Sequence, residues 1–107
     1  MANTRIETFI GFCVKAGKIT LGSGAIDTVR RGVFVLIVSA DAAKNTQKLA
    51  LKYKNRFDCP LIVCKSGLER AVNKPGCKIA SVRYKNLADS ILESLDDNYE
   101  YYDGGKN

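Results

Sequence analysis

The 107-residue chain contains no histidine and no tryptophan, and it has only two prolines. The absence of histidine removes the most common general acid and base of enzymes, and also the usual nitrogen ligand of zinc. Outside the last twelve residues the carboxylates are scattered singly, a pattern that does not favour paired acid-base chemistry. No nucleophile stands beside a base, and no cofactor loop is evident. We therefore expect a protein that is not an enzyme and that takes no metal, cofactor or small-molecule substrate.

Long hydrophobic runs are also missing from the sequence. No stretch approaches the roughly 18 apolar residues of a membrane-spanning helix. The N-terminus carries Arg5 and Glu7 among polar residues and lacks the basic start and apolar run of a secretory signal. These features predict a cytoplasmic protein that neither crosses a membrane nor is exported.

Cysteine is present, but its spacing is not that of a metal site. The four cysteines are far apart and include no C-x-x-C pair; they are Cys13, Cys59, Cys64 and Cys77. Apolar residues precede and follow Cys13, and an apolar run leads into Cys64. Free cysteine in such surroundings behaves as a small hydrophobic side chain. We predict buried, free thiols in a reducing compartment.

The composition is that of one globular domain with a basic surface. Apolar residues make up 46% of the chain and charged residues 26%, which excludes a disordered or low-complexity protein. The net charge is +6, and the last twelve residues hold four acids and one lysine, so that residues 1–95 carry +9. A charge of this size favours a polyanionic partner, because each phosphate that is neutralised releases counterions.

Helical and strand patterns alternate along the chain. Helices are predicted at residues 3–16, 24–31, 66–72 and 86–95, with one more that ends near residue 56, and strands at residues 18–21, 33–38, 61–64 and 78–83. The run at 33–38 is entirely apolar, which is typical of a strand buried on both faces. Since the connections are short, we predict a single α/β domain over residues 1–95, a three-layer α/β/α sandwich with five helices and four strands.

Residues 96–107 differ from the rest of the chain. They contain four acids and three tyrosines, Tyr99, Tyr101 and Tyr102, without a helical period. We predict a flexible acidic tail. Three interpretations of the tail stay open, namely a peptide for a partner protein, an autoinhibitory arm that competes for the basic surface, and plain disorder.

The segment from Gly17 to Gly24 is the most informative stretch for function. It leads a short strand through Gly22 and Gly24 into the start of a helix. Glycines leave the main chain open to a phosphate or a base edge, and the positive end of a helix favours an anion. The alternative is that these residues are simple turn glycines, because the segment lacks both the P-loop and the dinucleotide-binding patterns.

A second candidate is the loop from Asn73 to Lys78, where two lysines flank a Pro-Gly turn before the last predicted strand. Such a loop is exposed and held by rigid neighbours, and a solvated turn is the alternative interpretation. Arg30 and Arg31 could bind phosphate or could complement the negative end of the preceding helix.

The predicted helix that ends near residue 56 presents four lysines to water without aromatic residues among them, namely Lys44, Lys48, Lys52 and Lys54. We interpret them as a solvated face that gives only a nonspecific field. Asp41, Asn45 and Thr46 are interpreted as turn and capping residues.

Several motifs occur in a recognisable order. They are FIGFCVKAGK at residues 9–18, Leu21-Gly22, Arg31-Gly32 before the apolar strand, and SADAAKNT at residues 39–46. The chain from about Arg5 to Leu95 therefore resembles the YlxQ-type bacterial members of the ribosomal protein L-seven-Ae and L-thirty-e superfamily. The resemblance implies an α/β/α sandwich around a four-stranded mixed sheet, and binding of kink-turn RNA in ribosomes or other ribonucleoproteins.

In that superfamily the RNA is held by the glycine-led start of the second helix and by the loop before the last strand. These regions correspond here to Gly22–Ala25 and Asn73–Lys78, the two regions chosen above from the residues themselves. The expected RNA-binding residues are Lys18, Gly22, Ser23, Gly24, Ala25, Arg30, Arg31, Asn73, Lys74, Pro75, Gly76 and Lys78.

One departure from the family pattern leaves a second function open. Well-characterised kink-turn binders carry an Asn-Glu pair where this chain has Gly24-Ala25 or, with a shift of one residue, Ser23-Gly24. The leading hypothesis is a ribosomal or ribosome-associated protein that binds structured RNA and meets translation-associated proteins. The alternative is a protein adaptor of the same fold that has lost specific RNA recognition.

Overall fold

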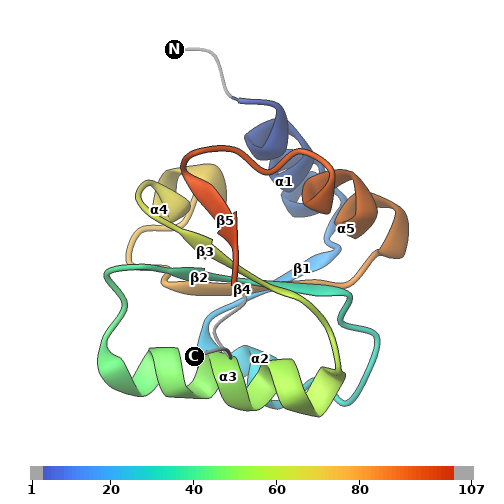
Figure 1. Cartoon of the computed structure of the whole chain (residues 1–107). Coiled ribbons are helices and arrows are strands. Elements are labelled where there is room, and N and C mark those ends of the chain that lie inside the picture. Colours follow the sequence, from blue (N-terminus) through green and yellow to red (C-terminus); the bar gives the residue numbers. More distant parts are fainter. Residues whose placement is uncertain (1–3, 103–107) are drawn as a thin grey trace.

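The computed structural model describes residues 4–102, which form five helices and five strands (Figure 1). The helices are α1 (Arg5–Ala16), α2 (Ser23–Asp27), α3 (Lys44–Phe57), α4 (Leu68–Ala71) and α5 (Lys85–Leu92). The strands are β1 (Ile19–Leu21), β2 (Val35–Ser39), β3 (Leu61–Cys64), β4 (Ile79–Val82) and β5 (Tyr99–Tyr101). The α/β class and the five helices are confirmed. None of these helices, within the described part of the chain, is long and apolar enough to cross a membrane.

The five strands form one mixed sheet in the order β1-β4-β2-β3-β5. Strand β4 is antiparallel to both β1 and β2, and β2 is parallel to β3. Strands β1, β2 and β3 therefore run in one direction. Their carboxyl ends meet at one end of the sheet, together with the beginning of β4, and their amino ends meet at the other.

Helices cover both faces of the sheet (Figure 1). Helices α1, α4 and α5 lie on one face, where Ile10, Leu68 and Ile91 join one core cluster. Helices α2 and α3 lie on the other face, and they contribute Ile26 and Tyr53 to a second cluster. The first four residues of β2 alternate between the two clusters, and all five residues of the strand are buried. The uninterrupted apolar run of this strand is explained because both of its faces are covered.

Helix α2 is shorter than predicted and ends at Asp27 instead of residue 31. The backbone N–H and the hydroxyl of Thr28 both donate to the carbonyl of Ala25, and the N–H of Val29 donates to the carbonyl of Ile26. These bonds tighten the last turn, and they replace the bond from Val29 to Ala25 that would continue an α-helix. Residues 29–34 therefore form a connecting segment that ends at the sheet.

The predicted flexible tail is wrong for the residues that form β5. This strand pairs with β3 as a fifth strand of the sheet, and the predicted number of four strands is corrected accordingly. Tyr99 is fully buried in the cluster beneath α1 and α5. Two alternating tyrosines among acids carry no helical period, and a three-residue strand is too short to be predicted without its partner. Residues 103–107 of the predicted tail lie outside the described residues.

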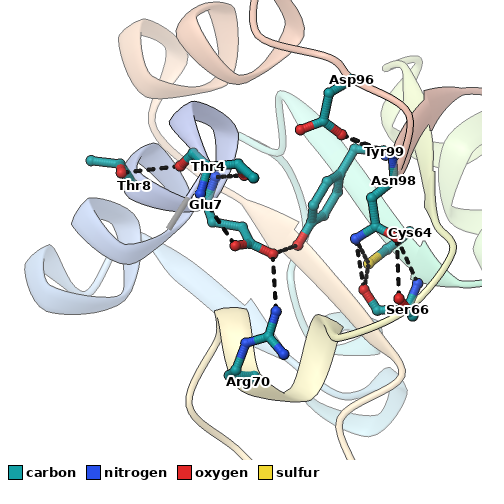
Figure 2. A network of polar contacts seen from close by, with 9 residues as sticks. All are labelled: Thr4, Glu7, Thr8, Cys64, Ser66, Arg70, Asp96, Asn98 and Tyr99. Atoms are coloured by element: carbon teal, nitrogen blue, oxygen red, sulfur yellow. Dashed lines mark hydrogen bonds and ion pairs between the residues drawn. The ribbon is translucent and has the colours of Figure 1, made fainter. Parts of the chain in front are cut away.

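Figure 2 shows what anchors Tyr99. Its hydroxyl donates a hydrogen bond to Oε2 of Glu7 at 3.1 Å, and Nη2 of Arg70 lies 3.7 Å from the same oxygen. Glu7 also closes the capping box of α1 with Thr4. A carboxylate is costly to bury without partners, and these contacts supply them. Three distant segments of the chain, α1, α4 and β5, are thereby joined at one buried carboxylate.

All four cysteines are free and buried, as predicted. Burial raises the pKa of the thiols of Cys13 and Cys59 to about 11. Only the thiolate reacts with disulfide reagents, so the folded protein should release almost no chromophore from Ellman's reagent at about pH 8. All four thiols should react after unfolding in guanidinium. Rapid reaction of one thiol in the folded protein would contradict this packing.

Candidate nucleic-acid interface

The fold brings the two predicted binding segments together at the carboxyl end of β1. The backbone N–H of Gly22, just after β1, donates to the carbonyl of Ile79, the first residue of β4, at 2.9 Å. The loop that precedes β4 therefore lies beside the start of α2. Between them is a groove of about 290 Å³, which we call the carboxyl-end groove. Its lining residues are Gly22, Ser23, Thr46, Lys74, Pro75, Gly76, Cys77, Lys78 and Ile79.

Glycine is required at two positions on the rim of this groove. Gly22 has φ 88° and ψ 144°, and Gly76 has φ 80°, conformations that side chains with a Cβ atom rarely adopt. A Cβ atom at either position would meet no atom within 4 Å, so the surrounding space is open. The main chain is therefore accessible at both edges of the groove, a surface that lets a backbone or a phosphate approach closely.

The loop from residue 73 to residue 78 is fixed by its own contacts. Asn73 adopts a left-handed conformation with φ 56°, and the N–H of Lys74 donates to the carbonyl of Glu69 at 2.9 Å. Asn73 does not line the carboxyl-end groove. It lines an adjoining hollow of about 490 Å³, which shares Lys74, Pro75 and Lys78 with the groove.

The fold is similar to that of solved structures of other proteins. A Bacillus halodurans protein of unknown function has a TM-score of 0.72 and 20% identity, with 89% of this chain and 100% of that chain covered. The Giardia lamblia 15.5kD RNA binding protein has a TM-score of 0.59 and 19% identity, with 87% of each chain covered. No protein-family model matches, and no curated protein matches. The chain shares the fold of these two proteins.

Within this shared fold, Gly24 and Ala25 lie next to the groove without lining it. Both are exposed on the first turn of α2, and a Cβ atom on Gly24 would meet nothing within 4 Å. Gly24 and Ala25 therefore leave the first turn of α2 open and offer no polar side chain there. Ser23 does line the groove, and its carbonyl accepts a hydrogen bond from the hydroxyl of the buried Tyr53 at 3.0 Å.

Three predicted site residues lie away from the groove. The N–H of Arg83 donates to the carbonyl of Lys18 at 2.8 Å, which places Lys18 at the amino end of β1, whereas Gly22 lies at its carboxyl end. Arg30 and Arg31 belong to the segment that leads into the amino end of β2. These three cations were expected to bind RNA together with the loop at residues 73–78, but the strand directions place them at the other end of the sheet.

Lys78 lies in the groove, but its charge is already balanced. Its Nζ atom lies 2.8 Å from Oε2 of Glu69 and 3.2 Å from Oδ1 of Asp41. Asp41 in turn accepts a hydrogen bond from the hydroxyl of Ser39. Lys74 is different, because within residues 4–102 no carboxylate lies within 4.0 Å of its ammonium group. Lys74 is therefore the cation of this loop that is available to an anion.

The ion pairs of Lys78 predict a pH dependence of stability. The hydrogen bond from Ser39, and then that from Lys78, lower the pKa of Asp41 below its ordinary 3.8, and Lys78 lowers the pKa of Glu69 below 4.5. A carboxyl group whose pKa is lowered by folding stabilises the fold at pH values above its pKa in the unfolded chain. This stabilisation is lost as the pH falls through the pKa of the group in the folded protein. Urea unfolding at about pH 6 and pH 3 should therefore differ less in Lys78→Gln than in the native chain. Lys74→Gln is the control and should leave the difference unchanged.

Two residues at this end of the sheet were not predicted as site residues. Thr46, interpreted from the sequence as a capping residue, lines the groove on the first turn of α3. Lys44, interpreted as part of a solvated face, begins the same helix and is exposed. Helix α3 follows the carboxyl end of β2, so its first turn lies at the same end of the sheet as Gly22. The position of both residues in the first turn of the helix that follows a buried strand was the signal that could have indicated them.

Proposed function

We propose that this chain is a non-catalytic RNA-binding protein that recognises structured, kink-turn-like RNA with the carboxyl-end groove. The observation that carries the proposal is the meeting of two glycine-containing segments, through the hydrogen bond from Gly22 to Ile79, around an accessible main chain. The fold is shared with a protein whose name describes RNA binding. The charge of +9 over residues 1–95 suits the same partner.

The groove favours recognition of RNA shape over RNA sequence. The open backbone at Gly22 and Gly76 lets a phosphate or a ribose approach closely, and the ammonium group of Lys74 can donate to a phosphate oxygen, a contact that fixes position without reading bases. Thr46 and Ser23 supply the hydroxyl groups. Because Gly24 and Ala25 carry no polar side chain, base-edge contacts of the Asn-Glu type are not part of the proposal. A bent RNA whose phosphates converge on a narrow groove fits this set of groups.

The same proposal includes three further points: the chain belongs to the L-seven-Ae and L-thirty-e superfamily, it is located in the cytoplasm, and it associates with ribosomes or translation factors. They rest on the ordered motifs of residues 9–46 and on the shared fold.

The proposal is tested by fluorescence titration of the full chain with a kink-turn RNA and with a straight duplex of equal length, at about 50 and 200 mM salt. Tighter binding of the bent RNA at both salt concentrations is the expected result. Equal binding of the two RNAs that disappears at the higher salt would contradict it, because only a nonspecific basic surface would then remain. That result would favour the adaptor function.

A further inference from the structure

A second surface lies at the opposite end of the sheet from the carboxyl-end groove. The N–H of Arg83 donates to the carbonyl of Lys18 at 2.8 Å, and the N–H of Phe34 donates to the carbonyl of Val82 at 2.9 Å. The first bond continues the register Ile19↔Val82 by one residue, and the second holds Phe34, the residue before β2, against Val82, which is also the partner of Val35. Lys18 and Arg83 are therefore partners on neighbouring strands, about 5 Å apart, and Phe34 lies just before the next strand, beside Val82.

The positive charges of Lys18 and Arg83 are not neutralised by carboxylates of the described residues. The guanidinium of Arg83 donates to two neutral acceptors, the hydroxyl of Thr20 and the carbonyl of Gly17, both at 2.8 Å. For the described chain, no carboxylate lies within 4.0 Å of the charged nitrogens of Lys18, Arg83, Arg30 or Arg31. Arg30 and Arg31 lie on the segment that runs into Phe34. At the carboxyl end Lys78, Lys65 and Arg70 are each within 4.0 Å of a carboxylate, whereas Lys44 and Lys74 are not.

Two aromatic rings are exposed among these cations. Tyr84 follows Arg83 directly and is 43% exposed, and Phe34 is 37% exposed. The Nζ atom of Lys18 lies 5.8 Å from the centre of the Tyr84 ring, so the ring and the cation form part of one surface. Exposed rings beside unpaired cations match the composition of sites that bind single-stranded nucleic acid, where bases stack on rings and phosphates meet cations.

We propose that this surface, which we call the basic end (Lys18, Arg30, Arg31, Phe34, Arg83 and Tyr84), binds an unpaired strand of RNA. The inference rests on the proposed function in that the partner is RNA, but it assigns a different site and a different form of RNA. A duplex hides its bases from aromatic rings, whereas an unpaired strand presents a base face and a phosphate at every nucleotide. About 13 Å of extended chain separates Lys18 from Gly22, so one RNA could reach the groove with its bent element and the basic end with a flanking strand.

The test uses the full chain and a fluorescein-labelled ten-nucleotide oligouridine, which has no secondary structure. Lys18→Gln removes one phosphate contact and should weaken oligouridine binding about eightfold at about 50 mM salt. Tyr84→Leu keeps the apolar bulk and removes the aromatic face, and it should weaken binding about fivefold or more. The matched control Lys74→Gln should leave oligouridine binding unchanged while it weakens binding of the kink-turn RNA. Melting followed by circular dichroism checks that each variant is folded.

The outcomes separate this inference from the proposed function. If oligouridine does not bind, or if Lys18→Gln and Tyr84→Leu bind it as well as Lys74→Gln does, the second site is rejected. The proposal that the carboxyl-end groove binds kink-turn RNA is not affected by that result. If oligouridine binding depends on the basic end but the kink-turn RNA shows no preference, the second site stands and the proposed function fails. A decapeptide made only of glutamate that competes as strongly as oligouridine would overturn the assignment to RNA, because it offers charge without bases.

Discussion

Replacing Tyr99 with alanine is expected to lower the free energy of unfolding by about 3–5 kcal/mol, the range for a fully buried large aromatic side chain. Tyr99 has no exposed surface and packs in the cluster formed by α1, α4 and α5. The substitution would leave a cavity beneath these helices, and it would remove a hydrogen-bond donor from the buried carboxylate of Glu7. Urea denaturation followed by circular dichroism measures the loss.

The control for this prediction lies two residues along the same strand. Tyr101 is 54% exposed, and Tyr101→Ala should change the free energy of unfolding by less than about 0.5 kcal/mol. Tyr99→Phe keeps the ring and removes the hydroxyl, with its bond to Glu7 and its contact with the Cys64 thiol, so it should cost about 1–2 kcal/mol. Equal stability of Tyr99→Ala and Tyr101→Ala would mean that residues 99–101 are a dispensable tail after all.

Combined replacement of Lys44 and Lys74 by glutamine is expected to weaken kink-turn RNA binding about 60-fold at about 0.1 M salt. When the logarithm of affinity is plotted against the logarithm of salt concentration, each phosphate contact contributes about −0.9 to the slope. Loss of one contact therefore weakens binding about eightfold at about 0.1 M salt. The two lysines come from different elements, α3 and the loop before β4, and no carboxylate of the described residues is paired with either. Titration at several salt concentrations should show a slope reduced by about two units.

Lys52 provides the matched control for this experiment. It is exposed on α3, about two helical turns after Lys44, and therefore farther from the groove than the first turn of that helix. Lys52→Gln should leave both the affinity and the slope nearly unchanged. If Lys52→Gln lost as much binding as Lys74→Gln, the RNA would respond only to the overall charge, and the groove would not be the site.

Much of the fold could be predicted because its signals are local. The apolar run before Ser39 predicts a strand buried on both faces, and β2 is buried along its whole length. Gly17 ends α1 in a left-handed conformation, as its place after a helical period indicates. Gly22 and Gly76 have positive φ at the two segments chosen as binding regions, because both turns need conformations that other residues rarely adopt.

The rest depended on contacts between residues far apart in the sequence. Strand β5 is held in place by Tyr99, which is buried under α1 and bonds to Glu7, a residue 92 positions earlier in the chain. No pattern within residues 96–102 indicates that contact. Lys78 looks like a free cation in the sequence, and only folding places Asp41 and Glu69 beside it.

Strand direction decided which cations can act together. Lys18 and Lys74 were both expected at the RNA-binding site. The antiparallel pairing of β1 with β4 puts Lys18 beside Arg83 and Gly22 beside Ile79, at opposite ends of the sheet. The sequence by itself determined the helices, the inner strands, the glycine turns and the excess of positive charge, because these depend on neighbouring residues and on composition. Only the tertiary structure decided the fifth strand, the neutralisation of Lys78 and the division of the basic residues between two ends, because each of these is a distance between segments that the chain brings together only on folding.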